Sequence, residues 1–402
     1  MNQQIAYQIS LNQLRNALTK HGYLASMTEE LNYKRVFARD GIITGLAGLV
    51  SGETDLIKGL STTLSSLHSN CGPIGQIPSN IQFDRNGNVT EVSYGKNSGR
   101  VDVNLWFIIG LCEYTLITGD TALAEAMKET VDRCLYLTSV WEYNSRGLIY
   151  VPDGGDWADE YILHGYSLHV QLLRIWALRL YSQVWKDKSV TTQADGFTEL
   201  IGLNYWPERS VDLGNYYHPQ AVRKYWKTED EPQFFLAGIT PGGYDLHFDA
   251  FSNALAILLD VPTTDQREKI VQFGTELIQG SVLKLIPAFW PPIKPEEKDW
   301  ESLLANVLYS FRNQPYKYHN GGTWPMVNGW WGMALEKSGV RASENIALAV
   351  NEFNKKDQET EWGFHEYGDT KTGNPEGVRY CTWSAAGAIL LDRAIAGKYL
   401  VW

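Results

Sequence analysis

Apolar residues recur at every third or fourth position along most of the chain, which is the spacing of one face of an α-helix. The pattern predicts helices over residues 9–19, 41–50, 57–67, 103–118, 122–138, 163–185, 249–259, 263–279, 327–337 and 341–355. Short segments rich in Gly, Pro, Asn and Asp separate these helices, and such residues favour turns. The chain is therefore predicted to be all-α.

The order of helix, loop and helix also predicts an architecture. Consecutive helical pairs fit a toroid of inner and outer helices, with a pocket at one end built by the connecting loops. Two short β-prone stretches, 147–151 and 281–286, are expected to form hairpins or edge strands on the loop side. Residues 1–402 lack a low-complexity linker and are expected to form one domain, with the polar segment 186–194 and the Pro-rich segment 287–298 as its weakest points.

Composition and charge exclude several classes of partner. The formal net charge of −11 is spread without a long run of either sign, so a nucleic acid or an anionic membrane finds no basic patch. The start of the chain lacks a signal-peptide pattern, and no apolar stretch is long enough to span a bilayer. The four cysteines show no CxxC spacing and are expected to be free thiols. These features predict a cytoplasmic protein.

Aromatic residues are unusually frequent, and they change this picture. The chain has 15 Trp and 22 Tyr, many of them next to Gly, Asp, His or Asn. Sugar-binding clefts combine aromatic faces, which cover the apolar side of a sugar ring, with polar side chains that bind its hydroxyls. Many of these aromatic residues are also expected to fill the core. The expected partner is a small saccharide.

The segment VPDGGDWADEYILHGY, residues 151–166, crowds ionisable side chains around a Gly-Gly turn. Cleavage of a glycosidic bond needs a carboxylic acid that protonates the leaving oxygen. Asp159, two residues after Trp157, suits this role, and Asp156 is the rival. Helix capping by one carboxylate, with solvated surface charge for the others, is the alternative interpretation. His164 is a candidate for binding a sugar hydroxyl or, alternatively, a helix-facing histidine.

A second carboxylate cluster lies in EWGFHEYGDTKTGNPEGVR, residues 361–379. Glu366 is the candidate for the second carboxylate. An inverting glycosidase places a base about 6.5–9.5 Å from its acid to activate water, whereas a retaining one places the two carboxyls about 5–5.5 Å apart. A loop salt bridge is the alternative role for Glu366. A third segment, YKYHNGGTWPMVNGWW at 316–331, resembles a binding wall that includes His319, Asn320, Trp324 and Trp330.

Three further polar residues open predicted helices. Arg39 and Asp40 in FARDG and Asp102 in RVDVNLWF either cap a helix N-terminus or face a sugar. No metal site is expected, because His164 and His169 are five residues apart and do not share one helix face. The chain also lacks a P-loop, a dinucleotide-binding fingerprint and a GxSxG nucleophile elbow.

Taken in order, FARDG, RVDVNLWF, DWADEYILHGYSLHVQ, YHNGGTWP, HEYGDTKTG and YCTWSAAGAIL resemble the neutral/alkaline invertase family and the related glucosidase domain of glycogen-debranching enzymes. The resemblance runs from about residue 36 to residue 395. It implies an (α/α)6 barrel and inverting hydrolysis without a cofactor, with Asp159 as general acid and Glu366 as general base. The expected sugar contacts are Arg39, Asp40, Asp102, Asp156, Trp157, His164, His319, Trp324 and Trp383.

The resemblance leaves substrate and reaction open to alternatives. Between the acid and the HGY triplet, similar invertases have a pair of arginines and one residue more than this chain, in which Glu160 and Tyr161 follow the expected acid. Sucrose is therefore the first substrate to try rather than the expected one. An amylo-α-1,6-glucosidase-like activity on oligosaccharides is one alternative. A sugar epimerase or isomerase that uses His164, His247 and His319 is another, and a non-catalytic sugar-binding protein is a third.

The place of three tryptophans bears on oligomeric state. Trp290, Trp330 and Trp331 are expected to lie either in the sugar cleft or at a contact between subunits of a homo-oligomer.

Overall fold

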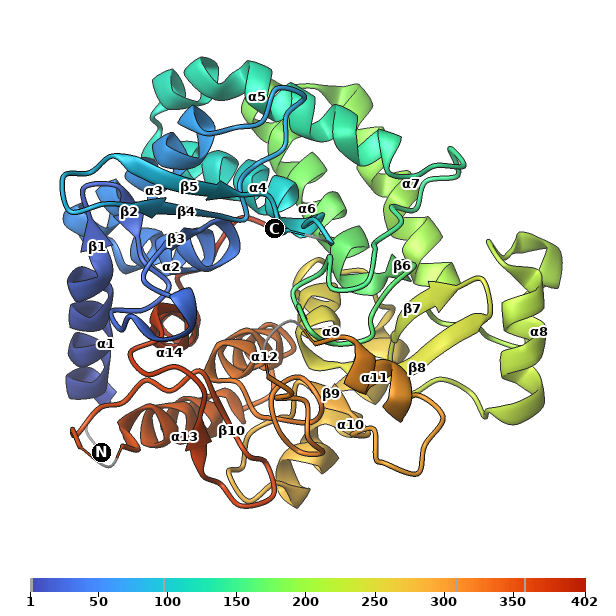
Figure 1. The fold of residues 1–402 in the computed structure, drawn as a ribbon. Helices are drawn as coiled ribbons and strands as arrows, with labels where there is room; N and C mark the ends of the chain where they lie inside the picture. Colours follow the sequence, from blue (N-terminus) through green and yellow to red (C-terminus); the bar gives the residue numbers. More distant parts are fainter. Residues whose placement is uncertain (1–2, 97, 308–309, 358) are drawn as a thin grey trace.

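Six helices form an inner ring in the computed structural model, which describes residues 3–96, 98–307, 310–357 and 359–402. They are α2 (Ala38–Ser51), α4 (Asp102–Thr118), α6 (Leu168–Trp185), α9 (Ala250–Leu258), α12 (Pro325–Lys337) and α14 (Thr382–Ile395). Each packs against the next in this order, and α14 packs against α2, which closes the ring (Figure 1). Most of their residues are buried, because each has neighbours on nearly all sides.

Six more helices cover the inner ring from outside. They are α1 (Gln3–Ala17), α3 (Thr54–Ser69), α5 (Thr121–Val140), α7 (Lys188–Asn204), α10 (Thr264–Gly280) and α13 (Ser343–Lys355). Each contacts an inner helix, and α1 at the start of the chain packs on α14 at its end. The outer helices are apolar on one face only, as in α3, which buries Leu56, Leu60, Leu64 and Leu67. The predicted all-α, (α/α)6 barrel is confirmed.

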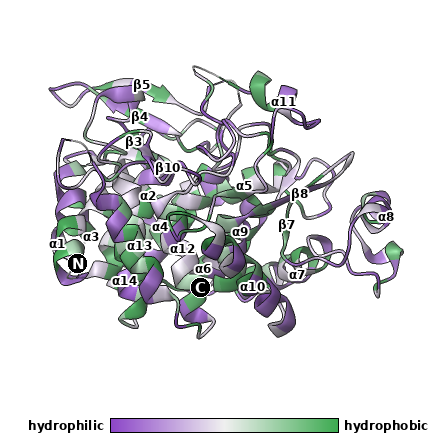
Figure 2. Ribbon diagram, turned by 90° about the horizontal axis from the view of Figure 1, so that it is seen from below, coloured by the Kyte–Doolittle hydropathy of each residue, from purple (hydrophilic) through white to green (hydrophobic). Residues whose placement is uncertain are grey.

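Short antiparallel strands gather at the end of the barrel where the inner helices begin (Figure 2). One sheet contains β3 (Val36–Phe37), β4 (Asn80–Phe83) and β5 (Val89–Ser93), and a second contains β6 (Tyr166–Ser167), β7 (Leu236–Thr240), β8 (Gly243–Asp249) and β9 (Phe289–Trp290). Two small ribbons pair β1 (Leu18–Thr19) with β2 (Gly22–Tyr23) and β10 (Tyr367–Gly368) with β11 (Pro375–Glu376). Because β3, β6 and β8 run directly into α2, α6 and α9, the sheets fix where these helices start.

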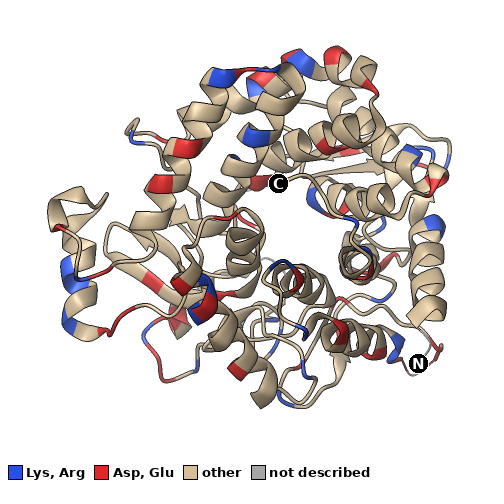
Figure 3. Cartoon of the chain, turned by 180° about the vertical axis from the view of Figure 1, so that it is seen from behind, with Lys and Arg blue, Asp and Glu red and all other residues tan. Residues whose placement is uncertain are grey.

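Four short elements complete the fold: α8 (Pro219–Thr228), α11 (Trp300–Ala305) and the 3-10 turns η1 (Glu30–Asn32) and η2 (Leu213–Asn215). No helix in the described part of the chain is long and apolar enough to cross a membrane. Acidic and basic residues are interspersed along the elements rather than gathered by sign (Figure 3).

Some local predictions were wrong. Of the two β-prone stretches, 147–151 contributes only a bridge from Val151 to Gly165, and 281–286 forms turns. The segment 186–194 is not a weak point but starts α7, which is capped because the Asp187 carboxylate accepts the Ser189 N–H at 2.9 Å. The helix predicted from residue 163 begins at Leu168, because Gly165 takes a φ of +84° and leads into β6.

Tryptophans fill the centre of the ring. Trp106 packs against Trp176 and Trp330 with ring centroids 6.0 and 6.2 Å apart. Trp330 and Trp331 are completely buried, so neither lies in a cleft or at a subunit contact, and the expectation for these two residues was wrong. Trp290, in β9, is partly buried.

The end of the barrel opposite the strands is closed by the last residues of the chain (Figure 2). The Trp176 indole donates to the Val401 carbonyl at 2.7 Å, and the Val401 N–H donates to the buried Glu113 carboxylate at 2.9 Å. The ring of Trp402 lies on Trp176 with centroids 4.9 Å apart. These contacts cover the floor of the barrel and leave its other end for the loops.

Candidate active site

A cavity of about 240 Å³ lies among the loops at the N-terminal ends of the inner helices. Loops and first helical turns from distant parts of the sequence line it. Eight of the residues predicted from the sequence are among them: Arg39, Asp40, Trp157, Asp159, His319, Trp324, Glu366 and Trp383. Asp159 and Glu366 therefore face one cavity although 207 residues separate them in the sequence (366 − 159).

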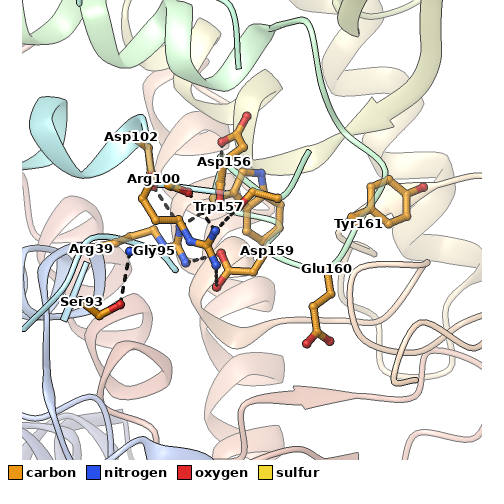
Figure 4. Close-up of polar contacts among 12 residues, drawn as sticks. Arg39, Ser93, Gly95, Arg100, Asp102, Asp156, Trp157, Asp159, Glu160 and Tyr161 are labelled. Atoms are coloured by element: carbon orange, nitrogen blue, oxygen red, sulfur yellow. Dashed lines mark hydrogen bonds and ion pairs between the residues drawn. The ribbon is translucent and has the colours of Figure 1, made fainter. Parts of the chain in front are cut away.

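Asp159 is held between two guanidinium groups (Figure 4). Its Oδ1 lies 2.9 Å from Arg39 and its Oδ2 lies 3.2 Å from Arg100. Burial raises the pKa of the Asp159 carboxyl, but the charges of Arg100 and Arg39 outweigh burial and hold the pKa below its usual value. The two guanidinium groups therefore favour the ionised form of this carboxyl.

Arg39 is fixed from behind by the first turn of α4. Its guanidinium donates to the Asp102 carboxylate at 3.0 Å and to the Asp156 backbone carbonyl at 3.1 Å. Asp102 is completely buried and does not line the cavity. Asp102 was predicted to contact a sugar. It instead contacts Arg39, which in turn contacts Asp159.

Asp156, the rival candidate for the acid, also lies behind the cavity wall. It is completely buried and accepts the Trp157 N–H at 2.6 Å and the Ser167 hydroxyl. Burial and the nearby Asp102 raise its pKa to about 8. The Trp157 indole donates to Asp249 at 3.2 Å, so two buried carboxylates hold Trp157, and through it the loop that carries Asp159.

Glu366 is almost completely buried, with 1% of its surface exposed, yet it reaches the cavity. The Tyr33 hydroxyl donates to it at 2.5 Å, the Val378 N–H donates at 3.3 Å, and the Arg312 guanidinium lies 3.9 Å away. Burial raises its pKa, and Arg312 and Tyr33 offset this only in part. The two candidate catalytic carboxyls thus have pKa values shifted in opposite directions.

Aromatic rings form one wall of the cavity. His319 stacks on Trp324 with centroids 4.8 Å apart, and Trp324 meets Trp383 edge to face at 5.5 Å. Burial lowers the pKa of His319 well below its usual value, so the imidazole is neutral. Its Nδ1 and the indole nitrogen of Trp383 are buried and have no hydrogen-bond partner among the described residues.

Asp40, next to Arg39 in the first turn of α2, also reaches the cavity. Burial raises its pKa to about 7, and the Asp159 and Glu366 carboxylates add to the rise against the effect of Arg39. When this carboxyl carries a proton, it can donate as well as accept a hydrogen bond.

His164 lies outside the cavity, and its prediction as a sugar contact is not supported by its place. Its side chain is 42% exposed and lies 3.1 Å from Asp153. His247 pairs with Asp245 at 2.6 Å and does not line the cavity either. Among the described residues, no group of three His, Cys, Asp or Glu side chains is arranged to hold a metal ion.

The cavity is also lined by Tyr33, Arg100 and Arg312, which were not predicted from the sequence. Arg312 bridges the loops of the two candidate carboxyls, because its guanidinium lies 3.2 Å from Glu160 and 3.9 Å from Glu366. It also covers the Tyr318 ring at 3.9 Å. Arg100 is the first residue of the RVDVNLWF motif, so its position was a usable signal. Tyr33 and Arg312 lie in segments without such a pattern.

Comparison with known proteins bears on this site. The family model described as alkaline and neutral invertase matches residues 16–206 and 215–397. Neutral/alkaline invertase 1, mitochondrial, of Oryza sativa subsp. japonica is 27% identical over 90% of this chain and 65% of its own length. Alkaline/neutral invertase C, mitochondrial, of Arabidopsis thaliana is 26% identical over 93% of this chain and 64% of its own length. The chain spans just under two thirds of these relatives.

Solved structures share the fold at low sequence identity. A mannosylglycerate hydrolase of family GH63 from Thermus thermophilus aligns with a TM-score of 0.64 and 12% identity, over 96% of this chain and 99% of that chain. A bacterial glucoamylase in complex with acarbose aligns with a TM-score of 0.65 and 16% identity, over 98% of this chain and 56% of that chain. Both alignments extend over nearly the whole barrel.

Proposed function

We propose that this chain, which belongs to the alkaline and neutral invertase family, is an inverting glycosidase that hydrolyses the α-glycosidic bond of a small saccharide. Membership of the family supports hydrolysis of a glycosidic bond. The observation that carries the assignment of residues is that Asp159 and Glu366 line the same cavity, between a wall of aromatic rings and a set of arginines.

Asp159 is proposed as the general acid. A glycosidic oxygen leaves readily only when it gains a proton as the bond to the anomeric carbon breaks. In the proposed reaction Asp159 gives its proton to that oxygen, and Arg39 beside it keeps the resulting carboxylate in place. This role requires Asp159 to gain a proton after substrate binds, because the empty cavity holds it ionised.

Glu366 is proposed as the general base. It removes a proton from a water molecule that attacks the anomeric carbon from the face opposite the leaving group, which inverts the configuration. The hydrogen bonds from Tyr33 and Val378 fix the orientation of its carboxylate. At the end of the reaction Glu366 holds the proton of the water and Asp159 is ionised, so one proton must pass through solvent before the next turnover.

The substrate is proposed to be a disaccharide or a short α-linked saccharide, with sucrose as the first compound to test. The relatives named as invertases support this choice. The isomerase alternative loses support from the geometry, because His319 lines the cavity whereas His164 and His247 lie outside it. An amylo-α-1,6-glucosidase-like activity is an outcome that the same experiment separates.

A cytoplasmic location is proposed on chemical grounds. All four cysteines are free thiols, and three of them are buried. Free thiols persist in reducing compartments. Two of the plant relatives are named as mitochondrial, so an organelle is the alternative.

The test is hydrolysis of a panel of sucrose, trehalose, maltose and isomaltose, followed by proton NMR of the released sugar. Release of a sugar with inverted anomeric configuration from one member supports the proposal. Cleavage of isomaltose alone identifies the debranching-like alternative, and isomerised free sugar without cleavage identifies the isomerase. Retained configuration contradicts the role of Glu366 as base.

A further inference from the structure

Arg100 has no role in the reaction described so far, although it contacts the proposed acid. It lies between β5 and α4, and 10% of its side chain is exposed. One terminal nitrogen lies 3.2 Å from Asp159 Oδ2. The other donates to the backbone carbonyls of Gly99, at 3.0 Å, and Gly154.

The two guanidinium groups on Asp159 differ in how firmly they are held. Arg39 stands in the first turn of α2, and moving it would leave the completely buried Asp102 carboxylate without its counter-ion. The further hydrogen bonds of Arg100 go to two glycine carbonyls. If Arg100 moves away, no buried charged group other than Asp159 loses a counter-ion. Arg100, rather than Arg39, is therefore the guanidinium that can move away from Asp159.

Several charged and titratable groups face Asp159 from the surrounding elements. They are Arg39 and Asp40 on α2, Arg100 before α4, Asp102 at the start of α4, Tyr318 and His319 in the loop before α12, and Glu366 in the loop after α13. The carboxyls favour a proton on Asp159, the arginines oppose it, and the imidazole of His319 is neutral. Removing one arginine therefore raises the pKa of Asp159.

A general acid must carry a proton when the leaving oxygen reaches it, and a carboxylate between two guanidinium groups does not. Resting on the proposed function of Asp159, we propose that Arg100 is a positioning residue that holds Asp159 as an anion in the empty cavity and moves off it when a saccharide enters. The sugar hydroxyls then accept the hydrogen bonds of the guanidinium, which stays charged, and Asp159 takes a proton from solvent.

The first measurement needs no catalysis. The pKa of Asp159 is followed by carbon-13 NMR of its carboxyl, identified by the signal that Asp159→Asn removes. Arg100→Gln keeps an amide for the glycine carbonyls but loses the charge, and is expected to raise the pKa of Asp159 by about one unit or more. Arg100→Lys, which keeps the charge, is expected to restore most of the wild-type value.

A matched control separates this contact from the general charge of the cavity. Arg35→Gln removes the same charge from the same cavity, but Arg35 pairs with Glu91 at 2.9 Å rather than with Asp159. The control should leave the pKa of Asp159 within a few tenths of a unit. An equal shift in Arg35→Gln and Arg100→Gln, or no shift in either, overturns the proposal.

The second measurement tests displacement. The same titration is repeated on Glu366→Gln, which lacks the proposed base, with the saccharide that the wild type hydrolyses, sucrose in the first instance. Binding is expected to raise the pKa of Asp159 by about one unit or more, and to raise it much less when Arg100→Gln is also present. A pKa that saccharide leaves unchanged overturns displacement. If the wild type hydrolyses no saccharide, the proposed function fails, while the first measurement still decides whether Arg100 holds the anion.

Discussion

Asp159 and Glu366 are the side chains whose replacement tests the proposed chemistry most directly. Asp159→Asn and Glu366→Gln keep shape but lose proton transfer, so each is expected to lower kcat by about 10²–10⁴-fold with folding intact. The measurement is steady-state kinetics with circular dichroism as a check on folding. Asp153→Asn is the matched control, because Asp153 has a 58% exposed side chain outside the cavity and should keep wild-type rates. Near-normal rates in either test variant would remove that residue from its role.

Asp156 makes a different prediction, about stability. Its pKa rises from an ordinary 3.8 to about 8 in the folded protein, so the folded state binds this proton more tightly than the unfolded state does. The proton on Asp156 stabilises the folded state fully below about pH 4, and this stabilisation is lost as the pH rises toward 8. The amide in Asp156→Asn does not titrate. The free energy of unfolding of this variant, minus that of the wild type, should therefore increase between pH 5 and pH 8. The increase should be at least about 1.4 kcal/mol, which corresponds to a pKa shift of one unit.

Urea unfolding of both proteins at pH 5, 6, 7 and 8 measures this difference. The hydrogen bonds to Trp157 and Ser167 can be kept by an amide, so the two proteins should be closest in stability at pH 5. A difference that is constant with pH would show that Asp156 does not titrate in this range.

At the scale of single elements, the crossing of α12 and α14 depends on two glycines. A Cβ on Gly329 would overlap the carbonyl oxygen of Gly387, and a backbone atom cannot move aside cheaply. Gly329→Ala is expected to destabilise the protein by about 2 kcal/mol or more. Gly196→Ala is the matched control, since a Cβ there meets nothing within 4 Å on exposed α7, and it should stabilise by about 0.5–1 kcal/mol. Urea denaturation compares both variants, and equal effects would contradict tight packing at the crossing.

The same elements show what the sequence could and could not predict. Helices such as α4 and α5 were predicted almost to their ends, because apolar spacing reports the face that a helix buries. The hairpin of β7 and β8 was missed, although β8 alternates apolar and polar residues and pairs locally with β7, so this alternation was a usable signal. Asp159 and Glu366 were found through carboxylates crowded near turns. Tyr33 and Arg312 were not predicted, because an isolated Tyr or Arg gives no signal in the sequence. They reach the cavity only because distant loops come together in the fold.

At the scale of the whole molecule, the two ends of the barrel have separate tasks. Trp402 packs on Trp176 at the end opposite the cavity, where the last residues cover the floor. Trp402→Ala is expected to lower the free energy of unfolding by roughly 2 kcal/mol, less than the roughly 3–5 kcal/mol of a fully buried tryptophan. KM for the hydrolysed saccharide should not change. Urea denaturation and steady-state kinetics test the two halves of this prediction, and a large change in KM would show that floor and cavity are coupled.

The closure of the ring by α14 against α2 has a consequence for how the protein is made. Arg39 and Asp40 are translated long before Glu366 and Trp383, which line the same cavity. A nascent chain that lacks α14 presents the apolar flanks of α2 and α12 to water, and its cavity has no far wall. The cavity is therefore complete only after α14 has been translated, and a translation product that ends before α14 exposes these apolar flanks to chaperones and proteases.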